Sequence, residues 1–158
     1  MVHTAVMTKP NSPRKTWMLI FSGERSNYCC SNPQGGNCYT NDIWALETAT
    51  CTWVKRRLSA ASGAPPRPRY GPTAWRNTHL GAVQITGGTC GAACGACGTC
   101  GHANDTFSAA LAQPAGVSWA QTRQAGAGPP PRDRHTFVLI DGAVPRVLDW
   151  GEFVKGKD

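Results

Sequence analysis

The sequence predicts an all-β chain made of repeated antiparallel units of four short strands. Gly and Pro supply 18 and 12 of the 158 residues, which is above average usage and argues against long helices. Apolar runs of strand length, such as 17–21 and 137–140, are bounded by Gly, Pro and Asn, with no helical periodicity between them. These runs and their flanking residues recur about 64 positions apart, which indicates an internal repeat.

Three kinds of residue set the repeat length: a glycine that ends an apolar strand, an Asn-Asp pair that opens the next strand, and a tryptophan on the strand after it. They are Gly23, Gly87 and Gly151; Asn41-Asp42 and Asn104-Asp105; and Trp53 and Trp119. The three glycines are 64 residues apart in both intervals. A fixed period of this kind predicts the same strand order in each copy.

The period divides the chain into two full units and part of a third. We expect a first repeat over 1–57, which begins within its first strand, and a second over 69–124 with a Cys-rich loop over 89–103. A partial third repeat covers 132–158, and linkers rich in Pro, Gly and Arg occupy 58–68 and 125–131. Four-stranded units of this length are typical of β-propeller blades.

The recurring residues have structural roles that follow from their chemistry. The diglycine Gly87-Gly88 permits positive φ where a neighbouring backbone or ring comes close. The Asn of each Asn-Asp pair can close an Asx turn, while the adjacent Asp accepts backbone N–H groups. Each tryptophan offers about 150–250 Å² of surface for packing one sheet on the next. We therefore predict no catalytic role for any of them.

The order of a diglycine strand, an Asn-Asp pair, a tryptophan and then a PPxRxRHT stretch before residue 137 resembles the kelch repeat. The resemblance covers nearly the whole chain. It implies a kelch-type β-propeller segment with one four-stranded antiparallel sheet per blade. The first and third copies depart from the pattern, because Glu24 and Glu152 replace the second glycine.

The number of repeats predicts an incomplete ring. Propellers typically contain four to eight blades, whereas this chain supplies two and part of a third. We expect apolar sheet faces to remain uncovered at both ends of the array. The chain is therefore predicted to be a fragment of a larger propeller, or to associate with itself through these faces.

The Cys-rich loop permits three interpretations. Cys90, Cys94 and Cys97 have the letter spacing of radical-SAM iron–sulfur sites, whereas Cys94, Cys97, Cys100 and His102 could surround zinc. We prefer the third, a low-complexity insertion in a variable loop. The total of eight cysteines also permits loop disulfides in an oxidising compartment.

Charge and motif content exclude several classes of function. The net charge is +7, but the basic residues are spread out and not interleaved with aromatics, so no nucleic-acid partner is predicted. No signal peptide or apolar membrane span is visible, which predicts no membrane partner and favours the cytoplasm. No P-loop, nucleophile elbow or dinucleotide fingerprint occurs, so we predict no enzyme activity and no cofactor.

The remaining prediction is a non-catalytic scaffold that binds another protein. Arg69 and Arg134 precede equivalent strands and could pair with the carboxylates of an acidic peptide. A salt bridge to an Asp of a neighbouring repeat is the alternative role for both. Two other functions stay open: an accessory propeller of a larger enzyme, such as an oxidase, or of a ubiquitin-ligase substrate adaptor, and a metal-binding Cys-rich loop protein.

Overall fold

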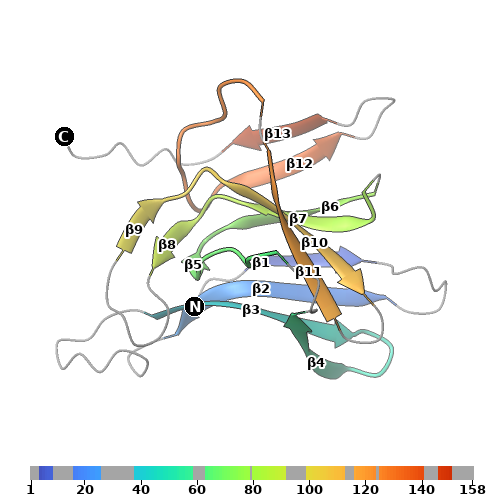
Figure 1. Cartoon of the computed structure of the whole chain (residues 1–158). Helices are drawn as coiled ribbons and strands as arrows, with labels where there is room; N and C mark the ends of the chain where they lie inside the picture. The colour runs from blue at the N-terminus through green and yellow to red at the C-terminus, as the bar shows by residue number, and fades with distance from the viewer. Residues whose placement is uncertain are drawn as a thin grey trace, which may run out of the picture.

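The computed structural model describes residues 4–8, 16–25, 38–58, 63–78, 80–91, 99–112, 116–123, 125–140 and 146–150. Within these ranges all of the regular structure is β-strand, which confirms the all-β prediction (Figure 1). The same ranges hold no helix of the length and apolar character that a membrane crossing requires.

The first repeat forms an antiparallel meander of four strands. They are β1 (Thr4–Thr8), β2 (Trp17–Arg25), β3 (Cys38–Glu47) and β4 (Thr52–Leu58). Alternate residues are buried over the middle of the two central strands, at Leu19 and Phe21 on β2 and at Ile43 and Ala45 on β3. This alternation places one face of the meander in the core, as the period of two of a β-strand requires.

The second repeat forms a meander with the same order. Its strands are β6 (Thr73–Asn77), β7 (Ala82–Thr86), β10 (Thr106–Ala112) and β11 (Gly116–Thr122). All five residues of β7 are buried, so both faces of this strand are covered. The first meander covers one of these faces.

Two smaller sheets complete the described structure. β5 (Arg69–Tyr70), β8 (Thr89–Gly91) and β9 (Thr99–His102) form a three-stranded sheet that also contacts β2 and β3. β12 (Thr136–Ile140) and β13 (Arg146–Trp150) form a hairpin, and β12 packs beside β6 (Figure 1).

The prediction of a propeller with separate blades is wrong for the described residues. Strands β4 and β11 pair in parallel at Arg57–Gly116 and Leu58–Val117, which joins the two meanders into one eight-stranded mixed sheet. The strand order is β1-β2-β3-β4-β11-β10-β7-β6, and the end strands β1 and β6 contact each other, so the sheet is nearly closed into a barrel. Two full repeats cannot complete a ring, and curling the sheet lets each meander cover an apolar face of the other.

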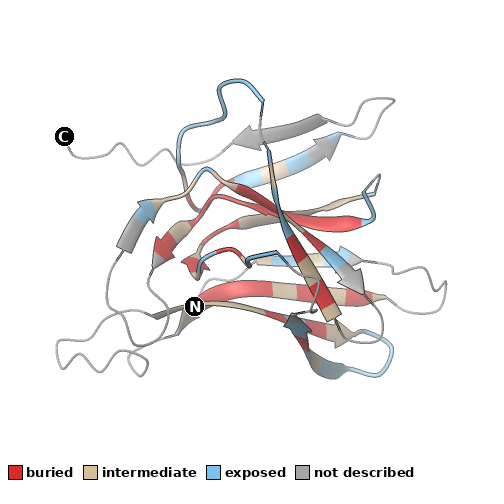
Figure 2. Ribbon diagram, viewed as in Figure 1, coloured by how far each residue is buried: buried red, intermediate tan, exposed pale blue. Residues whose placement is uncertain are grey.

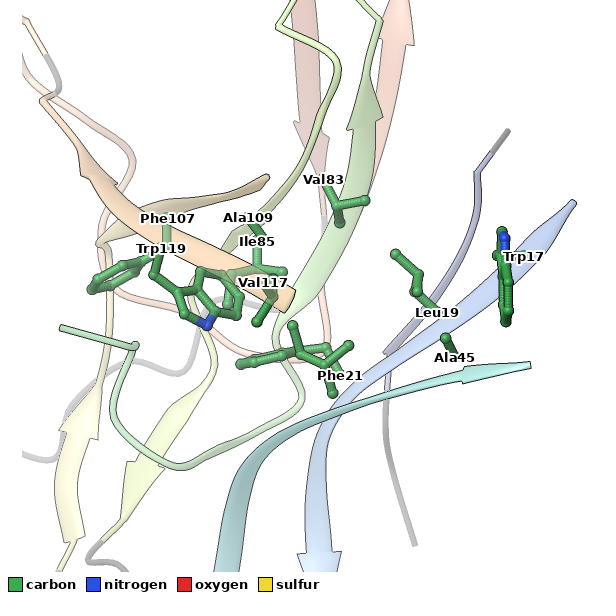
Figure 3. Packing of buried hydrophobic residues seen from close by; sticks show 11 residues of the cluster. Trp17, Leu19, Phe21, Ala45, Val83, Ile85, Phe107, Ala109, Val117 and Trp119 are labelled. Atoms are coloured by element: carbon green, nitrogen blue, oxygen red, sulfur yellow. The ribbon is translucent and has the colours of Figure 1, made fainter. Parts of the chain in front are cut away.

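The hydrophobic core lies between the two meanders (Figures 2 and 3). The edge of Phe21 meets the ring of Trp119 with the centroids 5.2 Å apart, and Phe107 contacts Trp119 in the same manner. Trp119 is 3% exposed, whereas Trp53, at the matching repeat position, is 45% exposed. The two recurring tryptophans therefore have different environments.

Candidate functional site

Arg69 is buried and fully engaged inside the second repeat. Its guanidinium forms two bonds with the Asp105 carboxylate, Nη1–Oδ1 at 2.6 Å and Nη2–Oδ2 at 3.1 Å. Nη1 also donates to the Gly87 carbonyl at 2.8 Å, and the side chain is 1% exposed. This bidentate pair ties β5 to the Asn-Asp turn before β10. Arg69 therefore has the salt-bridge role, but with an Asp of its own repeat, and its side chain does not face solvent.

The diglycine lies where the second and third repeats meet. A Cβ atom at Gly87 would lie 2.5 Å from His135 Cε1 and 2.8 Å from the Arg132 carbonyl oxygen. Gly87 also has a φ of +65°, and the N–H of Gly88 donates to the same Arg132 carbonyl at 2.8 Å. Only glycine combines this backbone conformation with so close an approach.

The pairing of the strands aligns the two glycine-containing strand ends one residue away from the predicted alignment. Ile43 and Thr106 both follow the Asn-Asp pair, and they pair with Phe21 and Thr86 respectively. Ser22 therefore matches Gly87, and Gly23 matches Gly88, one residue away from the spacing of 64. Ser22 has a φ of +63°, close to that of Gly87.

Arg69 and Arg134 both precede equivalent strands, β6 and β12, but the residue at the position equivalent to Arg69 is Arg132. Arg69 and Arg132 each stand four positions before the Thr that opens β6 or β12. The Ser22 hydroxyl donates to the Arg69 carbonyl, and the matching position, Gly87, lies against the Arg132 carbonyl. Each of these contacts joins one repeat to the next.

Arg134 instead belongs to an aromatic patch formed by three repeats. Its guanidinium carbon lies 5.1 Å from the ring centre of Tyr70, whose ring stacks on that of Tyr39 at 5.9 Å. Arg134 is exposed and both tyrosines are partly exposed. Tyr39 comes from the first repeat, Tyr70 from the second and Arg134 from the third. We call these three residues the Tyr–Arg patch.

The backbone fixes the position of Arg134. It has a φ of +51°, which non-glycine residues rarely adopt, and its N–H donates to the Gly71 carbonyl at 3.0 Å. The side chain packs over Gly71, where an added Cβ would lie 3.4 Å from Arg134 Cγ. Backbone strain of this kind persists only where surrounding contacts hold it, and it is frequent at ligand-binding sites.

Next to the patch, three polar side chains are joined by hydrogen bonds. The Thr89 hydroxyl donates to Asp133 Oδ2 at 2.9 Å and lies 3.0 Å from His102 Nδ1. Asp133 is 7% exposed. Since the hydroxyl gives its proton to the carboxylate, the His102 nitrogen is the donor in the second bond. The threonine lies between the acid and the histidine, unlike a catalytic triad, in which the histidine is central.

The electrostatics of the patch keep Tyr39 protonated. Burial raises the pKa of Tyr39 above its usual value of 10.0, and electrostatic interactions with Glu24, Tyr70 and Asp133 raise it further. The charge of Arg134 acts in the opposite direction. The Tyr39 phenol is therefore neutral at physiological pH and able to donate a hydrogen bond.

The two Asn-Asp pairs have different surroundings. Asn41 donates to the Pro66 carbonyl at 3.2 Å and so fastens the linker, while Asp42 pairs with Lys55 at 3.3 Å. Asn104 and Asp105 line an open polar hollow of about 640 Å³. The other residues around this hollow are Thr106, Gln121, Thr122 and Arg123.

We expect Asp42 to titrate below its usual value of 3.8. Burial raises the pKa of Asp42, but hydrogen bonds from Trp44, Thr40 and Lys55, with the charge of Lys55, outweigh that effect. The pair therefore adds stability above about pH 3.8 that is lost as the pH falls through the lowered pKa. An NMR titration of the carboxyl should show this pKa, and Lys55→Ala should raise it. An Asp42 pKa that Lys55→Ala leaves unchanged would contradict the assignment.

The cysteine interpretations are only partly within the described structure. Cys90 is disulfide-bonded, which excludes it as a thiolate ligand of an iron–sulfur cluster. Among the described residues no group of three or more His, Cys, Asp or Glu side chains could hold a metal ion. Cys94, Cys97 and the side chain of Cys100 lie outside the description, as does Gly151. Cys51, in the turn before β4, is a free and exposed thiol.

Sequence reasoning identified Arg134 but missed its partners. Tyr39 and Tyr70 do not recur at the repeat spacing, so the repeat pattern gave no reason to select them. Each tyrosine lies next to a recurring element, Tyr39 two residues before an Asn-Asp pair and Tyr70 directly after Arg69. Only the arrangement of the repeats in space brings them together.

The sequence matches no protein-family model and has no significant similarity to a curated protein.

Proposed function

We propose that the chain is a non-catalytic module that binds another protein through the Tyr–Arg patch. The observation that carries the proposal is the convergence of Tyr39, Tyr70 and Arg134, one from each repeat, at an exposed position. Tyrosine and arginine are enriched in the binding hot spots of protein interfaces. The recurring order of strands and motif residues supports a relation to kelch-type scaffolds.

The chemistry of the patch favours an acidic peptide segment as the ligand. An exposed guanidinium held over an aromatic ring keeps its outer N–H groups free to pair bidentately with a carboxylate. The stacked tyrosines add rigid apolar surface beside this charge, and such surface loses little entropy on binding. The net charge of +7 attracts an acidic ligand at long range.

Replacing Arg134 with Ala should weaken binding without lowering the melting temperature. A hydrogen bond to a charged group contributes about 1.5–3 kcal/mol, so we expect the Kd for a fluorescent oligo-glutamate peptide to rise at least about tenfold. Fluorescence anisotropy would measure this Kd, and added salt should raise it for the wild type. Stability should not change, because the Arg134 side chain is exposed.

Arg57→Ala is the matched control for this experiment. Arg57 is also an exposed arginine, but it lies on β4, away from the tyrosines. The control removes the same formal charge and should change the Kd far less. Equal effects of the two substitutions would mean that net charge alone attracts the peptide, and would refute the proposed site.

A further inference from the structure

The two repeat junctions within the chain use the same pair of sheet faces. At the first junction, Phe21 of the first repeat packs against Ile85, Phe107 and Trp119 of the second (Figure 3). At the second junction, Trp75 of the second repeat packs against Phe137 of the third, with ring centroids 4.9 Å apart. We call the face that packs on the following repeat the forward face, and the face that packs on the preceding repeat the backward face.

Strand register shows which residues form the backward face of the first repeat. Because Ile43 matches Thr106, Trp44 matches Phe107. Because Leu46 pairs with Trp53 and Ala109 with Trp119, those two tryptophans also match. Phe107 and Trp119 are 8% and 3% exposed, whereas Trp44 and Trp53 are 37% and 45% exposed. The first repeat therefore has a backward face with two exposed tryptophans, on which no other repeat packs in the described structure. Lys55 of the same repeat lies over the Trp44 ring, with its Nζ 5.5 Å from the ring centre.

The third repeat has the complementary face at the other end of the chain. The Phe137 side chain packs on the second repeat, so it lies on the backward face of β12. Val138 and Ile140 are one and three residues further along the strand, and the alternation of side chains places both on the forward face. Val138 matches Val6, which packs against the core from the forward face of the first repeat. Val138 and Ile140 are 42% and 44% exposed.

Exposed apolar side chains are concentrated on these two faces. Among the described residues, six large apolar side chains are exposed: Met7, Trp44, Trp53, Leu80, Val138 and Ile140. Three lie on the backward face of the first repeat and two on the forward face of the third. Leu80, in the turn before β7, is the exception. Large apolar side chains exposed together on one sheet face are typical of interaction sites.

We propose that the chain associates head to tail with a second copy of itself, with the forward face of the third repeat on the backward face of the first. The occupant follows from the two internal junctions, where the same kinds of face already pack on each other. The contact is heterologous, so a pair of copies keeps one free forward face and one free backward face, and successive copies form a ring or a filament.

Sedimentation velocity of the full chain tests this proposal. The apparent mass of the wild type should exceed the monomer mass of 16.8 kDa and should increase with protein concentration. Trp53→Lys, which blocks the backward face, and Val138→Lys, which blocks the forward face, should each be monomeric when alone. An equimolar mixture of the two should form a capped dimer, because each variant retains the face that the other lacks. Leu80→Lys should associate like the wild type.

Three results would overturn the proposal: a wild type that stays monomeric at all concentrations, a mixture that does not dimerise, and an equal loss of association in Leu80→Lys. Circular dichroism of each variant checks that its β-structure is intact. If Trp53→Lys does not fold, Met7→Lys replaces it, since Met7 lies at the exposed edge of the same face. A mixture that restores dimers also excludes a symmetric contact between two identical faces.

Discussion

Asp105→Asn is expected to lower the free energy of unfolding by about 3–5 kcal/mol. The substitution keeps the size of the side chain but leaves the Arg69 guanidinium, which is 1% exposed, without its counter-charge. The remaining acceptors for Arg69 are the new amide oxygen and the carbonyls of Gly87 and Arg67, and these neutral groups cannot neutralise the charge. Chemical denaturation would measure this loss as a lower denaturant concentration at the midpoint of unfolding, with an unchanged m-value.

Asp42→Asn is the matched control, because Asp42 occupies the same position in the first repeat. Its partner Lys55 is 55% exposed, so the pair should contribute at most about 1 kcal/mol. The contrast between the two substitutions isolates the effect of burial on the same motif residue. If both variants lost the same stability, the buried Arg69–Asp105 pair would not be what stabilises the second repeat.

Gly87→Ala is expected to destabilise the chain by about 3 kcal/mol or more. The left-handed backbone alone costs about 1–2 kcal/mol for a non-glycine residue, and crowding in a packed region adds about 1–3 kcal/mol. The new methyl group would meet the His135 ring at 2.5 Å and the Arg132 carbonyl at 2.8 Å, and the carbonyl cannot move without losing its bond to Gly88. Thermal unfolding of the variant would report this loss as a lowered Tm.

Gly81→Ala separates the two contributions. Gly81 has a φ of +59°, but a Cβ there would meet nothing within 4 Å. The control should therefore show the backbone cost alone, about 1–2 kcal/mol. Equal losses of stability at the two positions would mean that the third repeat does not lie as close to Gly87 as the structure indicates.

The repeat pattern predicts the strands well because the relevant signals are local. Alternating apolar residues and turn residues predict four strands in each full repeat, and both meanders contain them in that order. Two details are wrong: Asn41-Asp42 lies inside β3 and does not open it, and the predicted loop over 89–103 contains the short strands β8 and β9. A constant spacing of 64 does not hold for every element, because the loops between matching strands differ in length. The loop between β1 and β2 spans 9–16, whereas β6 and β7 are joined by 78–81.

Contacts between repeats could not be predicted from these signals. The parallel pairing of β4 with β11 involves Arg57 and Gly116, which are far apart in sequence, and no local pattern specifies such a pairing. The Tyr–Arg patch has the same origin, since Tyr39, Tyr70 and Arg134 meet only after three repeats have packed together. The sequence could indicate that Arg134 was of interest, but not that it lies over a stacked tyrosine pair.

The most direct test of the proposed function is an NMR titration of the isotope-labelled chain with the oligo-glutamate peptide. We predict that chemical-shift changes concentrate at the Arg134 guanidinium and at the rings of Tyr70 and Tyr39. Asp133 and Thr89, which support the patch, should shift less. Changes centred on Lys55 and Arg57 of β4, or no saturable change at the Tyr–Arg patch, would contradict the account.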